Sequence, residues 1–120
     1  MERPAAEVTT TPGMRRELTK SERSRLRELA SLAYERELSR ELADLERDFQ
    51  RWRGREIDAF DVSESIHRFH QGPARDLFSK YASANLEMAV AGALQEGIIS
   101  KDEAGPALLE HLADHLAVHR

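Results

Sequence analysis

The chain has 120 residues, of which 40% are apolar and 33% charged, with a formal net charge of −4 at pH 7. One domain is expected at this length, since domains commonly span roughly 100–200 residues, and the acidic balance argues against a nonspecific nucleic-acid binder. The absence of cysteine excludes disulfides, thiolate nucleophiles and sulfur-ligated metal centres.

The first segment, residues 1–18, predicts a flexible tail. It contains Pro4, three consecutive threonines and a Pro12-Gly13 turn, a composition that cannot fill a core. The segment lacks the apolar stretch of a secretory signal, and no apolar run in the chain approaches the ~20 residues of a membrane span. We therefore expect a cytoplasmic protein without a membrane segment, whose single domain covers residues 19–120.

Residues 20–53 predict one long helix. Thr19 and Glu22 form a capping-box pattern, in which each side chain accepts a hydrogen bond from the other residue's backbone amide, and Gly54 follows the helix end. No glycine or proline interrupts the segment, which would extend about 50 Å as a helix. A helix of this length exceeds what the shorter later segments can cover.

The apolar stripe of this helix moves to a second face part-way along. The first face carries Leu26, Leu29, Ala30 and Ala33, and the second carries Leu38, Leu42, Leu45, Phe49 and Trp52. The second set alternates spacings of four and three, which is typical of a helix–helix seam. The seam predicts either packing against the chain's own short helices or a homodimer contact.

The rest of the chain predicts about four shorter helices and no strand. Capping and turn residues place them at residues 59–71, from residue 73, at residues 86–96 and from residue 106. The fold class is therefore all-α, with one long amphipathic helix packed against the shorter ones. In the helix that begins at residue 73, Leu77, Phe78 and Tyr81 are expected to face inward. The expected core comprises Leu42, Leu45, Phe49, Trp52, Ile66, Phe69, Leu77, Tyr81, Val90, Leu94, Leu108, Leu112 and Leu116.

Polar groups concentrated around one helix boundary are the candidate ligand-binding residues: Glu64, His67, His70 and Arg75. The two histidines and Arg75 could hold an anion or a small ligand beside the free amides of the helix that starts at Pro73. Glu64 and His67 also match one Glu-x-x-His half of a di-iron site, whose second half a dimer would supply. A structural interpretation stays open, in which both imidazoles bind helix-end carbonyls or a neighbouring acid.

Three further histidines, His111, His115 and His119, recur every four residues near the C-terminus. Such a pair can chelate a metal, but histidines at a helix end also complement its exposed carbonyls, and this second interpretation is the one we adopt. We therefore assign no metal ligand and expect no cofactor.

Enzyme signatures are absent: the chain has no G-x-S-x-G, H-E-x-x-H, G-x-G-x-x-G or P-loop pattern. Ala93 and Gly97 have the small-residue spacing of a helix-turn-helix, but the next helix would present Asp102 and Glu103 to the nucleic acid. We assign no catalytic residue, and the sequence favours a protein that is not an enzyme and does not bind nucleic acid.

Trp52-x-Gly54 followed by Ile66-His67-x-Phe69-His70-x-Gly72-x-Ala74-Arg75 resembles a group of short bacterial helical proteins. The resemblance covers roughly residues 20–110. It implies a helical fold and a bacterial origin, and it brings no activity to transfer.

These patterns predict a helical protein–protein interaction module that self-associates as a homodimer through part of the long helix. The alternative is a protein that binds a small ligand, an anion or a metal through Glu64, His67, His70 and Arg75.

Overall fold

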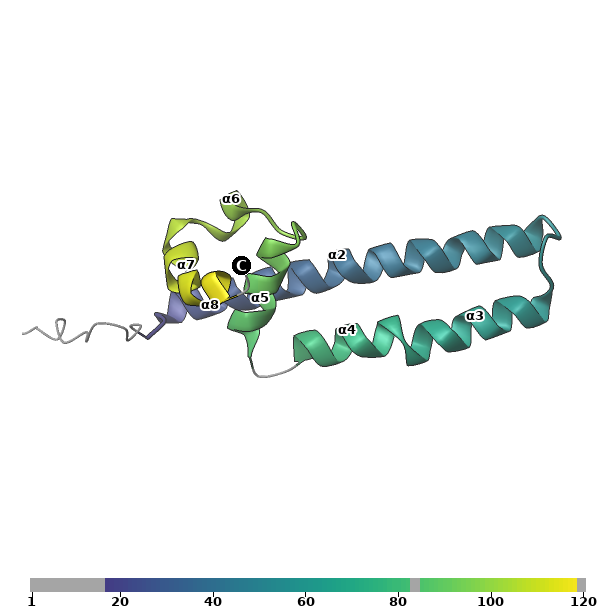
Figure 1. The fold of residues 1–120 in the computed structure, drawn as a ribbon, viewed down its shortest axis with the longest axis horizontal. Coiled ribbons are helices and arrows are strands. Elements are labelled where there is room, and N and C mark those ends of the chain that lie inside the picture. The colour runs from purple at the N-terminus through teal and green to yellow at the C-terminus, as the bar shows by residue number, and fades with distance from the viewer. Residues whose placement is uncertain (1–16, 83–84, 119–120) are drawn as a thin grey trace, which may run out of the picture.

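The structure, a computed structural model, describes residues 17–82 and 85–118. Over these residues it consists of helices joined by turns, without a strand (Figure 1). The helices are α2 (Lys20–Arg53), α3 (Ala59–Gln71), α4 (Pro73–Ala82), α5 (Leu86–Gln95), α6 (Lys101–Ala104), α7 (Pro106–His111) and α8 (Ala113–Val118). The all-α prediction is confirmed. Residues 1–16, most of the expected tail, lie outside the described residues, whereas Leu18 is partly buried against the core.

Helix α2 is the uninterrupted rod that the sequence predicts. The Thr19 hydroxyl accepts the Glu22 amide and the Glu22 carboxylate accepts the Thr19 amide, both at 3.0 Å. At the other end, the Gly54 amide donates to the Gln50 carbonyl at 2.9 Å. Because local residues satisfy the exposed amides and carbonyls at both ends, the helix boundaries follow from the sequence alone.

The rod organises two regions of the molecule (Figure 1). Its C-terminal half pairs with α3 and α4, which run back along it; we call residues 34–82 the hairpin. Its N-terminal half packs with α5 and the short helices that follow; we call residues 20–33 together with 86–118 the helical cluster. Helix α4 contacts both α2 and α5, so it connects the two regions.

The buried core lies in the helical cluster and at the adjoining end of α4. Its largest fully buried side chains are Leu29, Val90, Ile99 and Leu112, each at most 2% exposed. Among the predicted core residues, burial is confirmed for Leu77, Tyr81, Val90, Leu108 and Leu112, while Leu94 and Leu116 are partly buried against the core.

The core prediction was wrong for the hairpin. Leu42, Trp52 and Ile66 remain 45%, 38% and 44% exposed, and Leu45, Phe49 and Phe69 are only half-buried. The reason is geometric: the hairpin is two helices thick, so each helix covers one side of its neighbour and leaves the rest open. The cluster helices pack at the far end of the rod, away from this part of the seam (Figure 1).

The segment after Pro106 also differs from the prediction, because it forms two short helices rather than one. Leu112 ends α7 with φ −90° and ψ 3°, and its amide donates to the Leu108 and Glu110 carbonyls. Helix α8 starts at the next residue. Residue Ser100 caps the four-residue α6 through the predicted capping box with Glu103.

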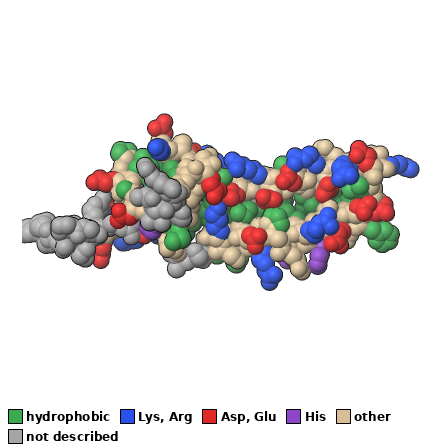
Figure 2. Space-filling model, in the orientation of Figure 1, with side chains coloured by type: hydrophobic (Ala, Val, Ile, Leu, Met, Phe, Trp, Pro, Cys, Tyr) green, Lys and Arg blue, Asp and Glu red, His purple; other side chains and the backbone are tan. Residues whose placement is uncertain are grey.

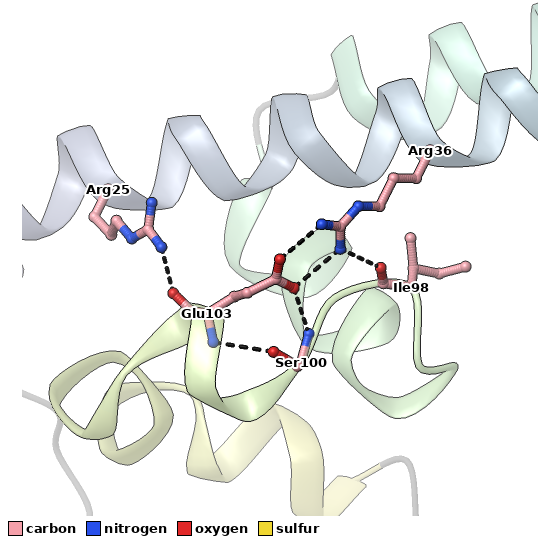
Figure 3. A network of polar contacts seen from close by, with 5 residues as sticks. All are labelled: Arg25, Arg36, Ile98, Ser100 and Glu103. Carbon is pink, nitrogen blue, oxygen red and sulfur yellow. Dashed lines mark hydrogen bonds and ion pairs between the residues drawn. The ribbon is translucent and has the colours of Figure 1, made fainter.

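A polar network ties α6 to the rod (Figure 3). The Arg36 guanidinium donates to both Glu103 carboxylate oxygens, at 2.9 and 2.7 Å, and to the Ile98 carbonyl at 2.9 Å. Arg25 donates to the Glu103 backbone carbonyl. This two-bond pairing is the strong geometry for arginine and carboxylate, and it fixes the cluster against the middle of α2.

Candidate functional site

The four predicted binding residues flank the junction between α3 and α4 but do not converge on one point. Glu64 pairs with Arg68 at 3.5 Å on an exposed surface, and His67 is exposed beside them. His70 and Arg75 do come together, because both line a cavity of about 430 Å³. The structure therefore supports half of the predicted cluster as a single site.

Gly72 shapes this junction. Its amide donates to the Arg68 carbonyl at 2.9 Å, and a Cβ at this position would lie only 2.9 Å from the same oxygen. Only glycine fits so close an approach of the backbone. Pro73 then begins α4, where its missing amide hydrogen costs nothing because the first helical residue has no intrahelical acceptor.

We call the space beside this junction the junction cavity. It is lined by Tyr34, His70, Gln71, Ala74, Arg75 and Phe78, none of which is a carboxylate. Tyr34 projects from α2 and stacks on Tyr81, with ring centroids 5.2 Å apart and planes 12° apart. The Tyr81 hydroxyl in turn donates to the Glu37 carboxylate. The Tyr34 ring therefore lines the cavity and is held in position by its stacking on Tyr81.

The lining also includes Phe78, which is 61% exposed although the sequence predicts that it faces inward. Its neighbours Leu77 and Tyr81 take the inward positions on α4 and leave Phe78 at the cavity edge. Sequence reasoning missed both Tyr34 and Phe78 as candidate site residues. The signal for Phe78 was available in the sequence, because α4 carries two aromatic residues, Phe78 and Tyr81, and a short surface helix buries only one of its faces.

The two histidines at the junction do not take the helix-end role that the sequence left open. The imidazole side chains of His67 and His70 make no hydrogen bond or ion pair with any residue in the ranges 17–82 and 85–118. Within the same ranges, no group of three or more histidine, aspartate and glutamate side chains could hold a metal ion. The Glu-x-x-His pattern therefore has no completing ligands in the described part of one chain.

The C-terminal histidines have a different partner from the one expected. His111 is 7% exposed, and its Nε2 atom lies 2.8 Å from Glu87 Oε2 on α5. His115 Nε2 lies 3.9 Å from the other oxygen of that carboxylate and is buried without a hydrogen bond. His119 lies outside the described residues. This pairing joins the last helices to α5 and serves the packing of the cluster.

The hairpin also carries large apolar side chains that the described helices cover only in part: Leu42, Phe49, Trp52 and Ile66, which we call the open strip. Phe49 and Trp52 contact each other edge to face, with ring centroids 6.5 Å apart. Figure 2 shows apolar side chains along the seam between the helices of the hairpin, with acidic and basic side chains on both flanks.

The aliphatic side chains of the open strip and a second, shallow cavity lie on different sides of the hairpin. This cavity has a volume of about 230 Å³, lies between α2 and α3, and has Asp44 and Arg68 among its lining residues. Leu42 stands about 160° around α2 from Asp44, and Ile66 stands about 160° around α3 from Arg68. Both apolar side chains therefore belong to the opposite side of the hairpin.

Comparison with protein-family models, with curated proteins and with solved structures gives no match. Among the described helices, none combines the length and the apolar character needed to cross a membrane. The junction cavity and the open strip are therefore the features of the described residues that bear on function.

Proposed function

We propose that this protein is a self-associating helical interaction module, in which two copies pack through the open strips of their hairpins. The observation that carries this proposal is the exposure of large apolar side chains on a helix pair: Leu42 at 45% and Ile66 at 44%. Burying such a side chain fully stabilises a protein by about 1.5–3 kcal/mol relative to full exposure. A partner that covers the strip gains part of this energy at several positions at once.

The area of the hairpin fits a second copy. Its paired helices extend about 30 Å and are about 20 Å wide, so one flat side measures about 600 Å² before side-chain relief is counted. A standard protein–protein interface buries about 800 Å² on each partner. One side of the hairpin is therefore close to the size that a specific dimer requires.

The charge distribution also favours a second copy as the partner. Residues 34–82 carry 9 basic and 11 acidic side chains, with both signs interspersed along α2. A surface that mixes acidic and basic side chains does not repel a second copy of itself. A partner with a strongly basic or strongly acidic surface would meet no surface of the opposite charge here. Two hairpins packed side to side form a four-helix bundle, and a two-fold axis lets the same strip serve both copies.

The test is the oligomeric state of wild-type protein and two matched variants. We expect light scattering to give twice the chain mass of 13.7 kDa at high concentration, with dissociation on dilution. Leu42→Glu places a charge on the open strip and should give monomer at every concentration. Ala43→Glu makes the same charge change at the adjacent exposed residue, off the seam, and should behave as wild type.

Circular dichroism should show unchanged helix content in both variants, since neither residue is buried in the core. A wild-type protein that stays monomeric up to its solubility limit would contradict the proposal. So would a dimer that both glutamate variants leave intact.

A further inference from the structure

We propose that the junction cavity binds a small aromatic carboxylate, with Arg75 holding the carboxylate and the aromatic walls enclosing the ring. All six lining residues belong to one chain, so the site needs no residue from a second copy. The cavity volume of about 430 Å³ lies within the ~300–1,000 Å³ typical of small-molecule sites.

The charge of the cavity selects an anion. The Arg75 side chain makes no ion pair or hydrogen bond with any residue in the described ranges, and no carboxylate lines the space that it borders. Two other arginines, by contrast, have carboxylate partners: Arg36 binds Glu103, and Arg68 pairs with Glu64. The planar guanidinium offers parallel N–H donors that match the two oxygens of a carboxylate.

The aromatic walls select a flat apolar body for this anion. Tyr34 is held in place by its stacking on Tyr81, while Phe78 presents an aromatic ring that is 61% exposed. Ala74, the smallest side chain of the lining, leaves the space between them open. A ring placed there would cover Phe78 and gain both apolar burial and aromatic contact.

Two further polar side chains complete the site and argue against a fully inorganic anion. His70 and Gln71 can each donate a hydrogen bond to a bound oxygen. With a single arginine and mostly apolar walls, the cavity offers too few donors to replace the hydration of a free phosphate. An aromatic acid instead needs one charged end and one apolar end, which is the arrangement that the cavity presents.

The experiment is calorimetric titration of the full-length protein with 2-naphthoate, with neutral 2-naphthamide and inorganic phosphate as reference ligands. We expect saturable binding of one naphthoate per chain, at least about 10-fold tighter than either reference, because the neutral amide loses the charge-assisted hydrogen bond and phosphate lacks the ring that packs against the aromatic side chains. Arg75→Gln should weaken naphthoate binding by about 10-fold or more, and Phe78→Ala should weaken it also.

The matched control is Arg68→Gln, which removes the same charge from the other side of the hairpin and should leave the affinity unchanged. Both arginines are exposed, so each variant should keep the helix content of wild type. Equal binding of naphthoate and naphthamide, equal effects of the two arginine substitutions, or no saturable binding by wild type would each overturn the proposal.

The outcomes for binding and for self-association remain distinguishable. Leu42→Glu should retain naphthoate binding, because Leu42 does not line the cavity. Arg75→Gln should retain the wild-type oligomeric state. A failure of the ligand proposal therefore appears in the calorimetry, and a failure of the dimer proposal appears in the light scattering.

Discussion

Glu103 joins the rod to the start of α6 through one side chain. Its carboxylate accepts two hydrogen bonds from Arg36 on the rod and one from the Ser100 amide at the start of α6. The hydrogen bonds from Arg36, followed by the one from the Ser100 backbone, lower the pKa of Glu103 to about 2. The same pairing raises the pKa of Arg36. Both shifts favour the charged forms, so the pair contributes to stability only while Glu103 is ionised.

This pairing predicts a defined acid sensitivity. An unfolded glutamate titrates near pH ~4.3, so the contribution of Glu103 is fully present above that value and is lost as the pH falls toward about 2. We expect Glu103→Gln to lower the thermal midpoint at neutral pH, and the gap from wild type to shrink across this acid range. Thermal denaturation followed by circular dichroism measures it.

The control for the acid series is Glu110→Gln, at an exposed carboxylate that pairs with no residue in the described part of the chain. This variant should follow the wild-type curve at every pH. A gap between Glu103→Gln and wild type that stays constant down to pH ~2 would show that the ionised carboxylate is not the source of the stability.

At the scale of elements, two glycines in helical surroundings have opposite roles. Gly72 separates α3 from α4, and a Cβ there would lie 2.9 Å from the Arg68 carbonyl oxygen. Gly92 lies inside α5, where a Cβ would meet no atom within 4 Å. Backbone is the obstacle at Gly72, and a backbone carbonyl cannot rotate away as a flexible side chain could.

Alanine substitution at these two positions should therefore change stability in opposite directions. Gly72→Ala should destabilise the protein by about 1–3 kcal/mol, the usual range for an overfilled site. Gly92→Ala should stabilise it by about 0.5–1 kcal/mol, because alanine has the higher helix propensity and finds open space. Urea denaturation of both variants is the measurement, and effects of the same sign would refute this account of the junction.

Across the whole molecule, packing is uneven. The other helices of the cluster pack on one face of the N-terminal half of α2 and bury Leu29 completely, whereas the hairpin half leaves Ile66 44% exposed. Both residues lie on apolar helix stripes in the sequence, and both are large aliphatic side chains. Their environments differ because one half of the rod has several neighbouring helices and the other half has a single helical layer beside it.

The stability of the single chain should follow this difference. We expect Leu29→Ala to cost about 2–5 kcal/mol of the free energy of unfolding, as for a buried leucine that leaves a cavity. Ile66→Ala should cost less than about 1 kcal/mol, as for an exposed position. Denaturation at the lowest practical concentration isolates the single chain, and equal losses for the two variants would contradict the observed burial.

For the candidate site, the sequence identified His70 and Arg75 because both stand beside the Gly72-Pro73 boundary. Nothing in the sequence places Tyr34 beside them, because Tyr34 is 36 residues before His70 in the chain. Glu64 and His67 share the segment but point to exposed surface, since successive helical residues turn by about 100° and only some reach the same side. Closeness in the sequence therefore identified some of the residues that line the cavity, and missed those that come from a distant helix.

The sequence by itself determined the helices and most of their ends. Capping residues such as Thr19, Asn85 and Ser100 act on amides two to three residues away, so their effect needs no distant partner. Tertiary structure alone decided which apolar faces are covered, placing the cluster on the first half of α2 and a single helical layer on the second. The apolar stripe of an amphipathic helix predicts which face is buried, but the positions of helices far away in the sequence determine what packs against that face.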